Sequence, residues 1–206
     1  MAQALFRTCI YGIIISLSVL FQFILHYFLI HIGYSITRVK SIIFALTTGL
    51  VIAYVTYRYG ISYRLLIYAV LIELLMCISL VDIEHKIIPD RLNLAVALTG
   101  AVHLTLVDNI YSHILAFFAA GLSFLLMSLI SKGGIGGGDV KLIASLGLVY
   151  GLLPITYIIC YSLIIAAIAG ALMIVIGNKN LRSEIALAPY ICITAIVYIA
   201  QFSKIN

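Results

Sequence analysis

Apolar runs of about 20 residues follow one another along almost the whole chain, and only short polar segments separate them. Hydrophobic residues occupy 65% of the 206 positions and charged residues only 9%, and the mean hydropathy is +1.24. A hydrocarbon core of roughly 30 Å requires about 20 apolar residues in each spanning helix. The sequence therefore predicts an all-α, polytopic membrane helix bundle in lipid. We expect one integral membrane domain over residues 1–206, without a sizeable soluble domain.

Polar breaks and Gly- or Pro-containing breaks divide the chain into about eight transmembrane helices. The first apolar run is longer than the core of a signal peptide and no small-residue cleavage site follows it, so we expect a retained helix. The boundary between the sixth and seventh spans is the least defined, because Gly151 and Pro154 stand in a nearly continuous apolar run. The expected spans are 8–31, 41–57, 62–81, 92–107, 110–131, 140–156, 157–177 and 186–203.

Basic side chains are distributed unequally over the two sets of loops. Eight Lys and Arg stand on one side and four on the other, so the positive-inside rule makes the first side cytoplasmic and puts both chain termini outside. No basic stretch contains interleaved aromatic residues, so we expect no nucleic-acid partner. The predicted cytoplasmic side carries Arg38, Lys40, Lys86, Arg91, Lys132, Lys141, Lys179 and Arg182, and the other side carries Arg7, Arg58, Arg64 and Lys204.

Three of the seven acidic residues stand in one short segment between the third and fourth expected spans. Residues 82–90 read DIEHKIIPD and contain Asp82, Glu84 and Asp90. Asp90 is interpreted first as part of a solvated turn, in which it caps the following helix. Asp82 differs, because it stands where a helix leaves the membrane. A metal site at Asp82, Glu84 and His85 is disfavoured, since adjacent polar residues in a surface turn usually face water.

A glycine-rich stretch opens the sixth expected span. Residues 133–142 read GGIGGGDVKL, so five of the six residues before Asp139 are glycines. A phosphate-binding loop would require Gly-Lys-Ser/Thr after the glycines, and a dinucleotide fingerprint would require a preceding strand. Glycines permit close backbone approach, which would let an extended substrate or a neighbouring helix reach the carboxylate of Asp139. A flexible linker is the alternative.

Asp82 and Asp139 stand at the predicted cytoplasmic ends of two different helices. Such a pair suggests a dyad that shares one proton, in which one carboxylate activates water and the other acid polarises a peptide carbonyl. This chemistry is hydrolysis without a metal or another cofactor. Helix polarity favours the anion of Asp139 at an N-terminus and the protonated form of Asp82 at a C-terminus. We therefore predict that Asp139 is the general base and Asp82 the acid.

These motifs resemble those of type IV prepilin peptidases. Gly136, Gly138 and Asp139 fit the GxGD signature of that family of aspartyl proteases, and Lys141 stands in a segment similar to the family's sequence just after the signature. Residues 82–90 resemble the family's other motif, in which Ile-Pro precedes a second aspartate. Residues 188–190, which read APY, look like a degenerate form of the family's Gly-Pro-Phe. The resemblance covers residues 62–203, and residues 1–61 add two transmembrane helices.

The resemblance implies a membrane endopeptidase of the bacterial cytoplasmic (inner) membrane. It would remove the short basic leader of type IV prepilin or pseudopilin precursors at the cytoplasmic face, with Asp82 and Asp139 catalytic. Glu84, Asp90, Gly136, Gly138 and Lys141 match motif or substrate-binding positions without being assigned to catalysis. Bifunctional family members carry a segment with paired CxxC motifs between the first two spans. Only residues 31–40 stand there in this chain, and its four cysteines form no CxxC, so we expect cleavage without N-methylation.

Three alternatives stay open. A bifunctional peptidase and N-methyltransferase is one, and a non-catalytic subunit of a pilus or secretion machine is another. The third is a small proton- or cation-coupled carrier, in which Glu73 would join Asp82 and Asp139 in an ion path. Glu73 stands nine residues before Asp82, near the middle of the bilayer. Its simpler interpretation is a protonated carboxyl bonded to a Tyr or Ser of a neighbouring helix.

Overall fold

The computed structural model describes residues 2–131, 134–176 and 186–202, and in this part of the chain helices are joined by short turns, without strands. A short 3₁₀ turn, Leu104–Leu106, follows the fourth helix. The α-helices are α1 (Ala2–His31), α2 (Arg38–Tyr59), α3 (Tyr63–His85), α4 (Asp90–His103), α5 (Ile110–Ile130), α6 (Gly137–Tyr150), α7 (Leu152–Val175) and α8 (Ala188–Phe202). The predicted all-α membrane bundle is confirmed, since five of these helices are long and apolar enough to cross a bilayer.

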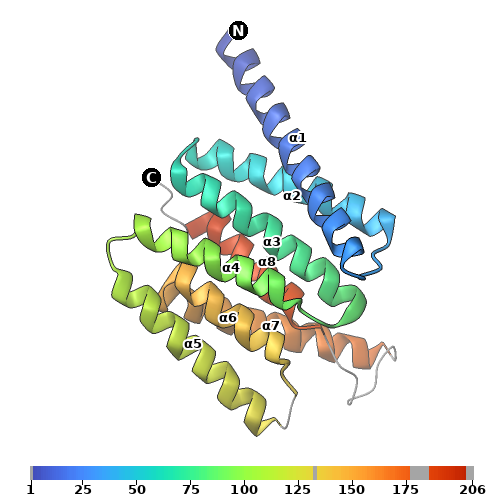
Figure 1. Cartoon of the computed structure of the whole chain (residues 1–206), viewed down its shortest axis with the longest axis vertical. Helices are drawn as coiled ribbons and strands as arrows, with labels where there is room; N and C mark the ends of the chain where they lie inside the picture. The colour runs from blue at the N-terminus through green and yellow to red at the C-terminus, as the bar shows by residue number, and fades with distance from the viewer. Residues whose placement is uncertain (1, 132–133, 177–185, 203–206) are drawn as a thin grey trace.

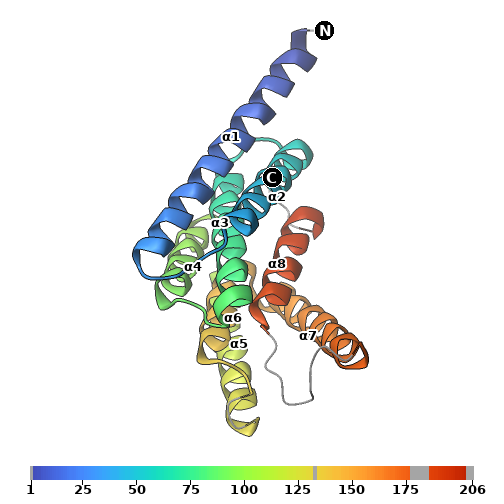
Figure 2. The ribbon, with the colours of Figure 1, turned by 90° about the vertical axis from the view of Figure 1, so that its right-hand side faces the viewer.

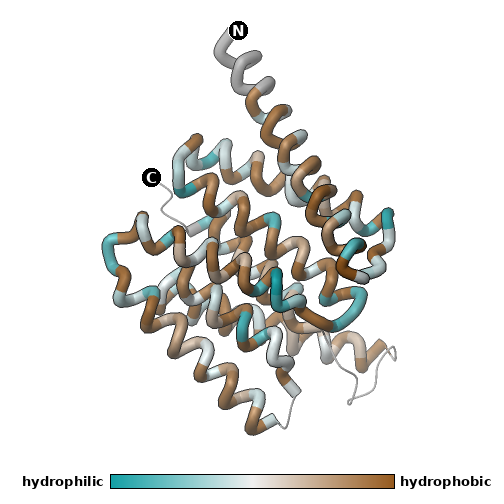
Figure 3. Tube along the Cα trace, viewed as in Figure 1, coloured by the Kyte–Doolittle hydropathy of each residue, from teal (hydrophilic) through white to brown (hydrophobic). Residues whose placement is uncertain are grey.

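Helix α3 occupies the centre of the bundle. It packs against α2, α4 and α8, and more weakly against α1 (Figure 1). Most of its residues between Leu71 and Asp82 are buried, whereas α1 and α5 expose large apolar side chains. The brown tube of these outer helices in Figure 3 is the surface expected of helices that face lipid.

Helices α4, α5 and α6 approach one another closely at glycines. A Cβ atom at Gly147 of α6 would lie 2.7 Å from the backbone of Ala116 in α5. A Cβ atom at Gly100 of α4 would lie 2.8 Å from the Cβ of Leu148 in α6. Lipid supplies little hydrophobic force between helices, so small residues that permit such contact stabilise membrane bundles. Helix α7 diverges from this cluster and lies on the opposite side of the molecule from α1 (Figure 2).

One end of the bundle gathers the polar turns. Lys40 at the start of α2 lies 3.2 Å from Glu84 at the end of α3, and Lys141 of α6 lies 2.7 Å from Asp90 of α4. Arg58 at the end of α2 and Arg64 at the start of α3 lie at the opposite end. Lys132, Lys179, Arg182 and Lys204 lie outside the described residues. The described loops with most of the Lys and Arg therefore lie at one end of the bundle, and the described loops of the other set lie at the opposite end, as expected.

The lengths and one boundary of the helices differ from the prediction. The predicted sixth span, 140–156, ends six residues too late, because Gly151 adopts φ 76° and separates α6 from α7. Pro154 then lies in the first turn of α7, where its missing N–H removes no helical hydrogen bond. Helices α4 and α6 have 14 residues each and α8 has 15 described residues, so these three are shorter than the expected spans.

Candidate active site

Asp82 lies in the last turn of α3 and is only 5% exposed. The helix ends just beyond it, because Lys86 adopts a left-handed conformation and donates its N–H to the carbonyl of Asp82 at 2.9 Å. The side chain of Asp82 accepts a hydrogen bond from the backbone N–H of Ala188 at 3.1 Å. Ala188 is the first residue of α8, so Asp82 joins the end of one helix to the start of another.

Asp139 lies in the first turn of α6. Gly136 caps this helix in an extended conformation, and its carbonyl accepts a hydrogen bond from the backbone N–H of Asp139 at 3.1 Å. Oδ2 of Asp139 lies back against Gly136, 3.2 Å from the place that a Cβ atom there would take. The other oxygen, Oδ1, is buried and has no partner among the described residues.

The fold brings these two carboxyl groups together, although 56 residues separate them. Burial and, to a smaller extent, the negative charge of Asp82 raise the pKa of Asp139 from 3.8 to about 6, and the hydrogen bond from Gly136 opposes both effects. Cys192 of α8 is fully buried and lies within the electrostatic influence of both aspartates. The end of α3 and the starts of α6 and α8 therefore form one acidic site, in which Asp82 is buried and Asp139 is half-buried.

Asp82 lies at the N-terminus of a second helix, which its place in the sequence does not reveal. The dipole of α8 and the N–H of Ala188 favour the anionic form of Asp82, and they oppose the larger effect of burial on the same carboxyl group. At Asp139 the dipole of α6 favours the anion, but burial and the charge of Asp82 outweigh it and raise the pKa. These effects oppose the acid and base roles inferred from α3 and α6 alone. The proton therefore belongs to the coupled pair, and the individual roles stay a prediction.

Gly138 places Asp139 against the turn that follows α3. A Cβ atom at Gly138 would lie 2.9 Å from the Cβ of Ile88, so a side chain does not fit there. The carbonyl of Gly138 accepts a hydrogen bond from Nδ2 of Asn93 at 3.1 Å. Asn93 is 3% exposed. The sequence analysis did not predict it as a site residue, although it stands just three residues after Asp90. The segment that approaches these glycines closely is thus the turn between α3 and α4.

The remaining motif residues connect elements at the rim of the site. Lys141 and Asp90 form a well-exposed ion pair between α6 and α4. The interpretation of Asp90 as the cap of this helix was wrong, because Asp90 lies in the first turn of α4, Pro89 takes the cap position, and no side chain makes a capping hydrogen bond there. Glu84 binds Lys40 and accepts the backbone N–H of Thr37 at 3.3 Å. Next to it, a ring nitrogen of His85 lies 2.8 Å from the carbonyl of Ser35. Glu84 and His85 therefore hold the turn between α1 and α2.

Glu73 lies apart from this site. It is 3% exposed in α3 and accepts a hydrogen bond from the hydroxyl of Ser18 in α1. A serine of a neighbouring helix is one of the two partners expected for this carboxyl group. Within the described part of the chain, no group of three or more His, Cys, Asp or Glu side chains has the arrangement of a metal site.

Comparison with known proteins identifies relatives of this sequence. A family profile described as "Type IV leader peptidase family" matches residues 68–175. A Bacillus subtilis (strain 168) protein named "Prepilin leader peptidase/N-methyltransferase" is 31% identical over 74% of this chain and 62% of its own length. Proteins of the same name from Pseudomonas aeruginosa and Legionella pneumophila are 29% and 30% identical, over 72% and 70% of this chain. The match covers 53% of each of those two relatives. No solved structure matches.

Proposed function

The chain belongs to the type IV leader peptidase family, and from this membership we propose that it is an aspartic endopeptidase that removes the leader of type IV prepilin or pseudopilin precursors. The region that matches the curated relatives covers between about half and three fifths of their length, and their names include this peptidase activity. The observation that carries the proposal is the position of the buried Asp82 and the half-buried Asp139 at the polar end of the bundle, where Ala188 binds Asp82 and Gly138 packs against the turn after α3.

The geometry suits hydrolysis by a pair of carboxyl groups. One oxygen of Asp82 is held by Ala188, while Oδ1 of Asp139 has no partner among the described residues. A water bound between the carboxyls would lose a proton to the anionic member as it attacks the peptide carbonyl. The protonated member would donate a hydrogen bond to the carbonyl oxygen as negative charge develops there. The same proton then passes to the leaving amine, and the peptide C–N bond breaks.

The site faces the cytoplasm in this proposal. Arg38, Lys40, Lys86, Arg91 and Lys141 all lie at the end of the bundle that holds the dyad, and short loops rich in Lys and Arg stay on the cytoplasmic side. The membrane would be the bacterial inner membrane, since a precursor with a basic leader meets the enzyme before export. The catalytic end would then lie where that leader resides.

Cleavage without N-methylation is the second part of the proposal. The relatives are named as peptidases and N-methyltransferases, whereas residues 32–37 form a short turn between α1 and α2 with no CxxC pair. Mass spectrometry of a precursor processed by this protein alone would show an unmodified new N-terminus. An N-methylated product would contradict this part and leave the cleavage proposal intact.

Co-expression with a prepilin precursor tests the activity directly. The wild-type protein should convert the precursor to the shorter mature form, and Asp82→Asn or Asp139→Asn should each lower the rate by about 10²-fold or more. Asp108→Asn is the matched control, because Asp108 lies beyond α4 at the opposite end of the bundle from the dyad. Substantial cleavage by either dyad variant would remove the dyad from the mechanism.

A further inference from the structure

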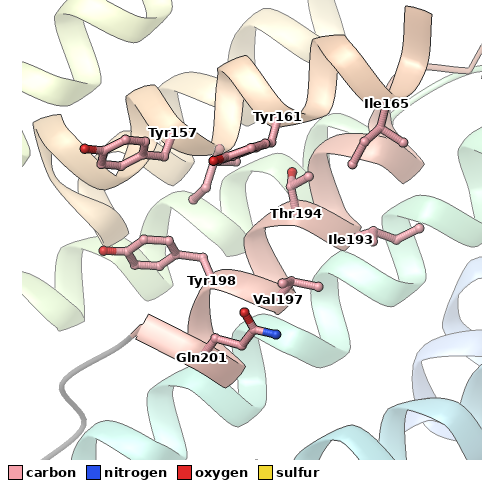
Figure 4. A pocket seen from close by; sticks show the side chains of 9 residues that line it. Tyr157, Tyr161, Ile165, Ile193, Thr194, Val197, Tyr198 and Gln201 are labelled. Atoms are coloured by element: carbon pink, nitrogen blue, oxygen red, sulfur yellow. The ribbon is translucent and has the colours of Figure 1, made fainter. Parts of the chain in front are cut away.

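Helices α7 and α8 leave a cavity of about 650 Å³ between them (Figure 4), and its lining residues do not include Asp82 or Asp139. One face of each helix lines it. Helix α7 contributes Tyr157, Tyr161 and Ile165, which recur every four residues, and α8 contributes Ile193, Val197 and Gln201 at the same spacing. Residues four apart lie above one another on a helix, so the cavity is a groove that follows the helix axes.

The groove begins close to the acidic site. Ala188, whose N–H binds Asp82, stands five residues before Ile193, which is about 7–8 Å along the axis of α8. Gln201 stands 13 residues after Ala188, which is about 20 Å along the same axis. The groove therefore starts within two helical turns of the dyad and continues toward the opposite end of the bundle.

The polar groups of the groove distinguish it from an ordinary lipid-facing surface. Tyr157 and Tyr161 are 57% and 59% exposed, and the exposed side chain of Gln201 lies at the far end. Helix α7 is long and apolar enough to span a bilayer, and Tyr161 lies nine residues inside it. A hydroxyl or amide that faces hydrocarbon lacks a hydrogen-bond partner, which is costly. A protein helix can supply such partners through its side chains, and an acyl chain cannot.

We propose that the α7–α8 groove binds the hydrophobic helix of the precursor while its leader is cleaved. This inference rests on the proposed peptidase function and adds a second binding surface to it. The resemblance to prepilin peptidases implies that the cleaved bond stands just before the hydrophobic helix of the precursor, so that helix would start at Asp82 and Asp139. The helix must then continue into the bilayer in the direction of α8, and the groove lies along that path. Its tyrosines offer flat contact area and hydroxyl groups to the arriving helix.

Photo-crosslinking in membranes tests the position of the precursor. A photoreactive amino acid replaces Tyr161 in the full-length Asp139→Asn protein, which is co-expressed with a prepilin precursor. The control position is Leu17, which is 60% exposed. Its helix, α1, lies on the opposite side of the molecule from α7 (Figure 2). We expect an adduct with the precursor from position 161 and none from position 17. An adduct between two copies of this chain, equal adducts from both positions, or adducts with lipid alone would overturn the proposal.

Kinetics separate this inference from the peptidase function. Val197→Trp would fill the groove and should raise KM for a full-length precursor by about 10-fold, while cleavage of a truncated precursor that lacks the hydrophobic helix stays near wild type. Activity on the truncated precursor also shows that the variant folds. Equal loss on both substrates, or no loss on either, would refute the groove. Absence of cleavage by the wild-type protein would instead refute the peptidase function.

Discussion

Gly138→Ala tests whether the contact between Gly138 and Ile88 positions Asp139. The new Cβ would lie 2.9 Å from the Cβ of Ile88, whereas ordinary contacts begin at 3.4 Å, so the two segments must separate by at least 0.5 Å. Ile88 is 7% exposed and precedes Pro89, so it has little freedom to move. Overpacking of this kind costs about 1–3 kcal/mol. Catalytic groups tolerate displacements of about 0.5 Å, and 1 Å can cost about 100-fold in rate.

We therefore expect Gly138→Ala to lower kcat for precursor cleavage by about 10- to 100-fold while the protein still folds. Gly137→Ala is the matched control, because it stands in the same helical turn, also without a positive φ, and a Cβ there meets nothing within 4 Å. The control should keep most of its activity and gain up to about 1 kcal/mol from helix propensity. The assays are cleavage in membranes and thermal unfolding in detergent. Wild-type kcat in Gly138→Ala, or equal loss in both variants, would refute the contact with Ile88 as the cause.

Three further predictions concern charged and polar groups. Asp139→Asn should lower the rate of cleavage by about 10²-fold or more. It should also stabilise the protein by roughly 3 kcal/mol above pH 6, because the pKa of Asp139 is raised from 3.8 to about 6 and its ionisation destabilises the fold as pH rises through that range. Thermal unfolding at pH 7.5 and below pH 4 should show this gain and its disappearance, and an equal gain at both pH values would contradict it. A double-mutant cycle of Asp90→Ala and Lys141→Ala should give a coupling free energy of unfolding below about 1 kcal/mol, since both side chains are exposed. Both variants should still cleave the precursor, and a large loss of cleavage would instead assign the pair to catalysis. Ser18→Ala should lower the free energy of unfolding by about 1–3 kcal/mol, because the buried carboxyl group of Glu73 loses its hydrogen-bond donor. The control Ser16→Ala removes only an exposed hydrogen bond within its own helix. Equal unfolding temperatures of the two variants would show that the bond from Ser18 to Glu73 does not stabilise the fold.

The fold was predictable to the extent that composition determines it. Apolar runs and the spacing of Lys and Arg predict helices and their order, because a bilayer admits few other structures. The boundary at Gly151 was not predictable from hydropathy, since residues on both sides of it are equally apolar. The backbone conformation of that single glycine, rather than a polar break, separates α6 from α7.

The residues of the candidate site were predictable from the sequence, but the hydrogen bonds that join them to other elements were not. Asp82 and Asp139 stand out as rare charges beside helix ends, and glycines before Asp139 indicate a close approach. The hydrogen bond from Ala188 to Asp82 joins residues 106 positions apart and uses a backbone N–H, which no side-chain pattern reveals. Asn93 likewise acts on a backbone carbonyl, and its amide resembles any other polar residue near a turn.

The three short helices have a consequence for the surrounding bilayer. Helices α4, α6 and α8 have 14, 14 and 15 described residues, or about 21–23 Å each, against a hydrocarbon thickness of roughly 30 Å. All three adjoin the dyad, so hydrophobic mismatch there would thin the membrane locally and bring headgroups and water down to the carboxyl groups. The water for hydrolysis would then reach the carboxyl groups through this locally thinned part of the bilayer. Longer acyl chains, which resist thinning, should slow the enzyme without touching any of its residues.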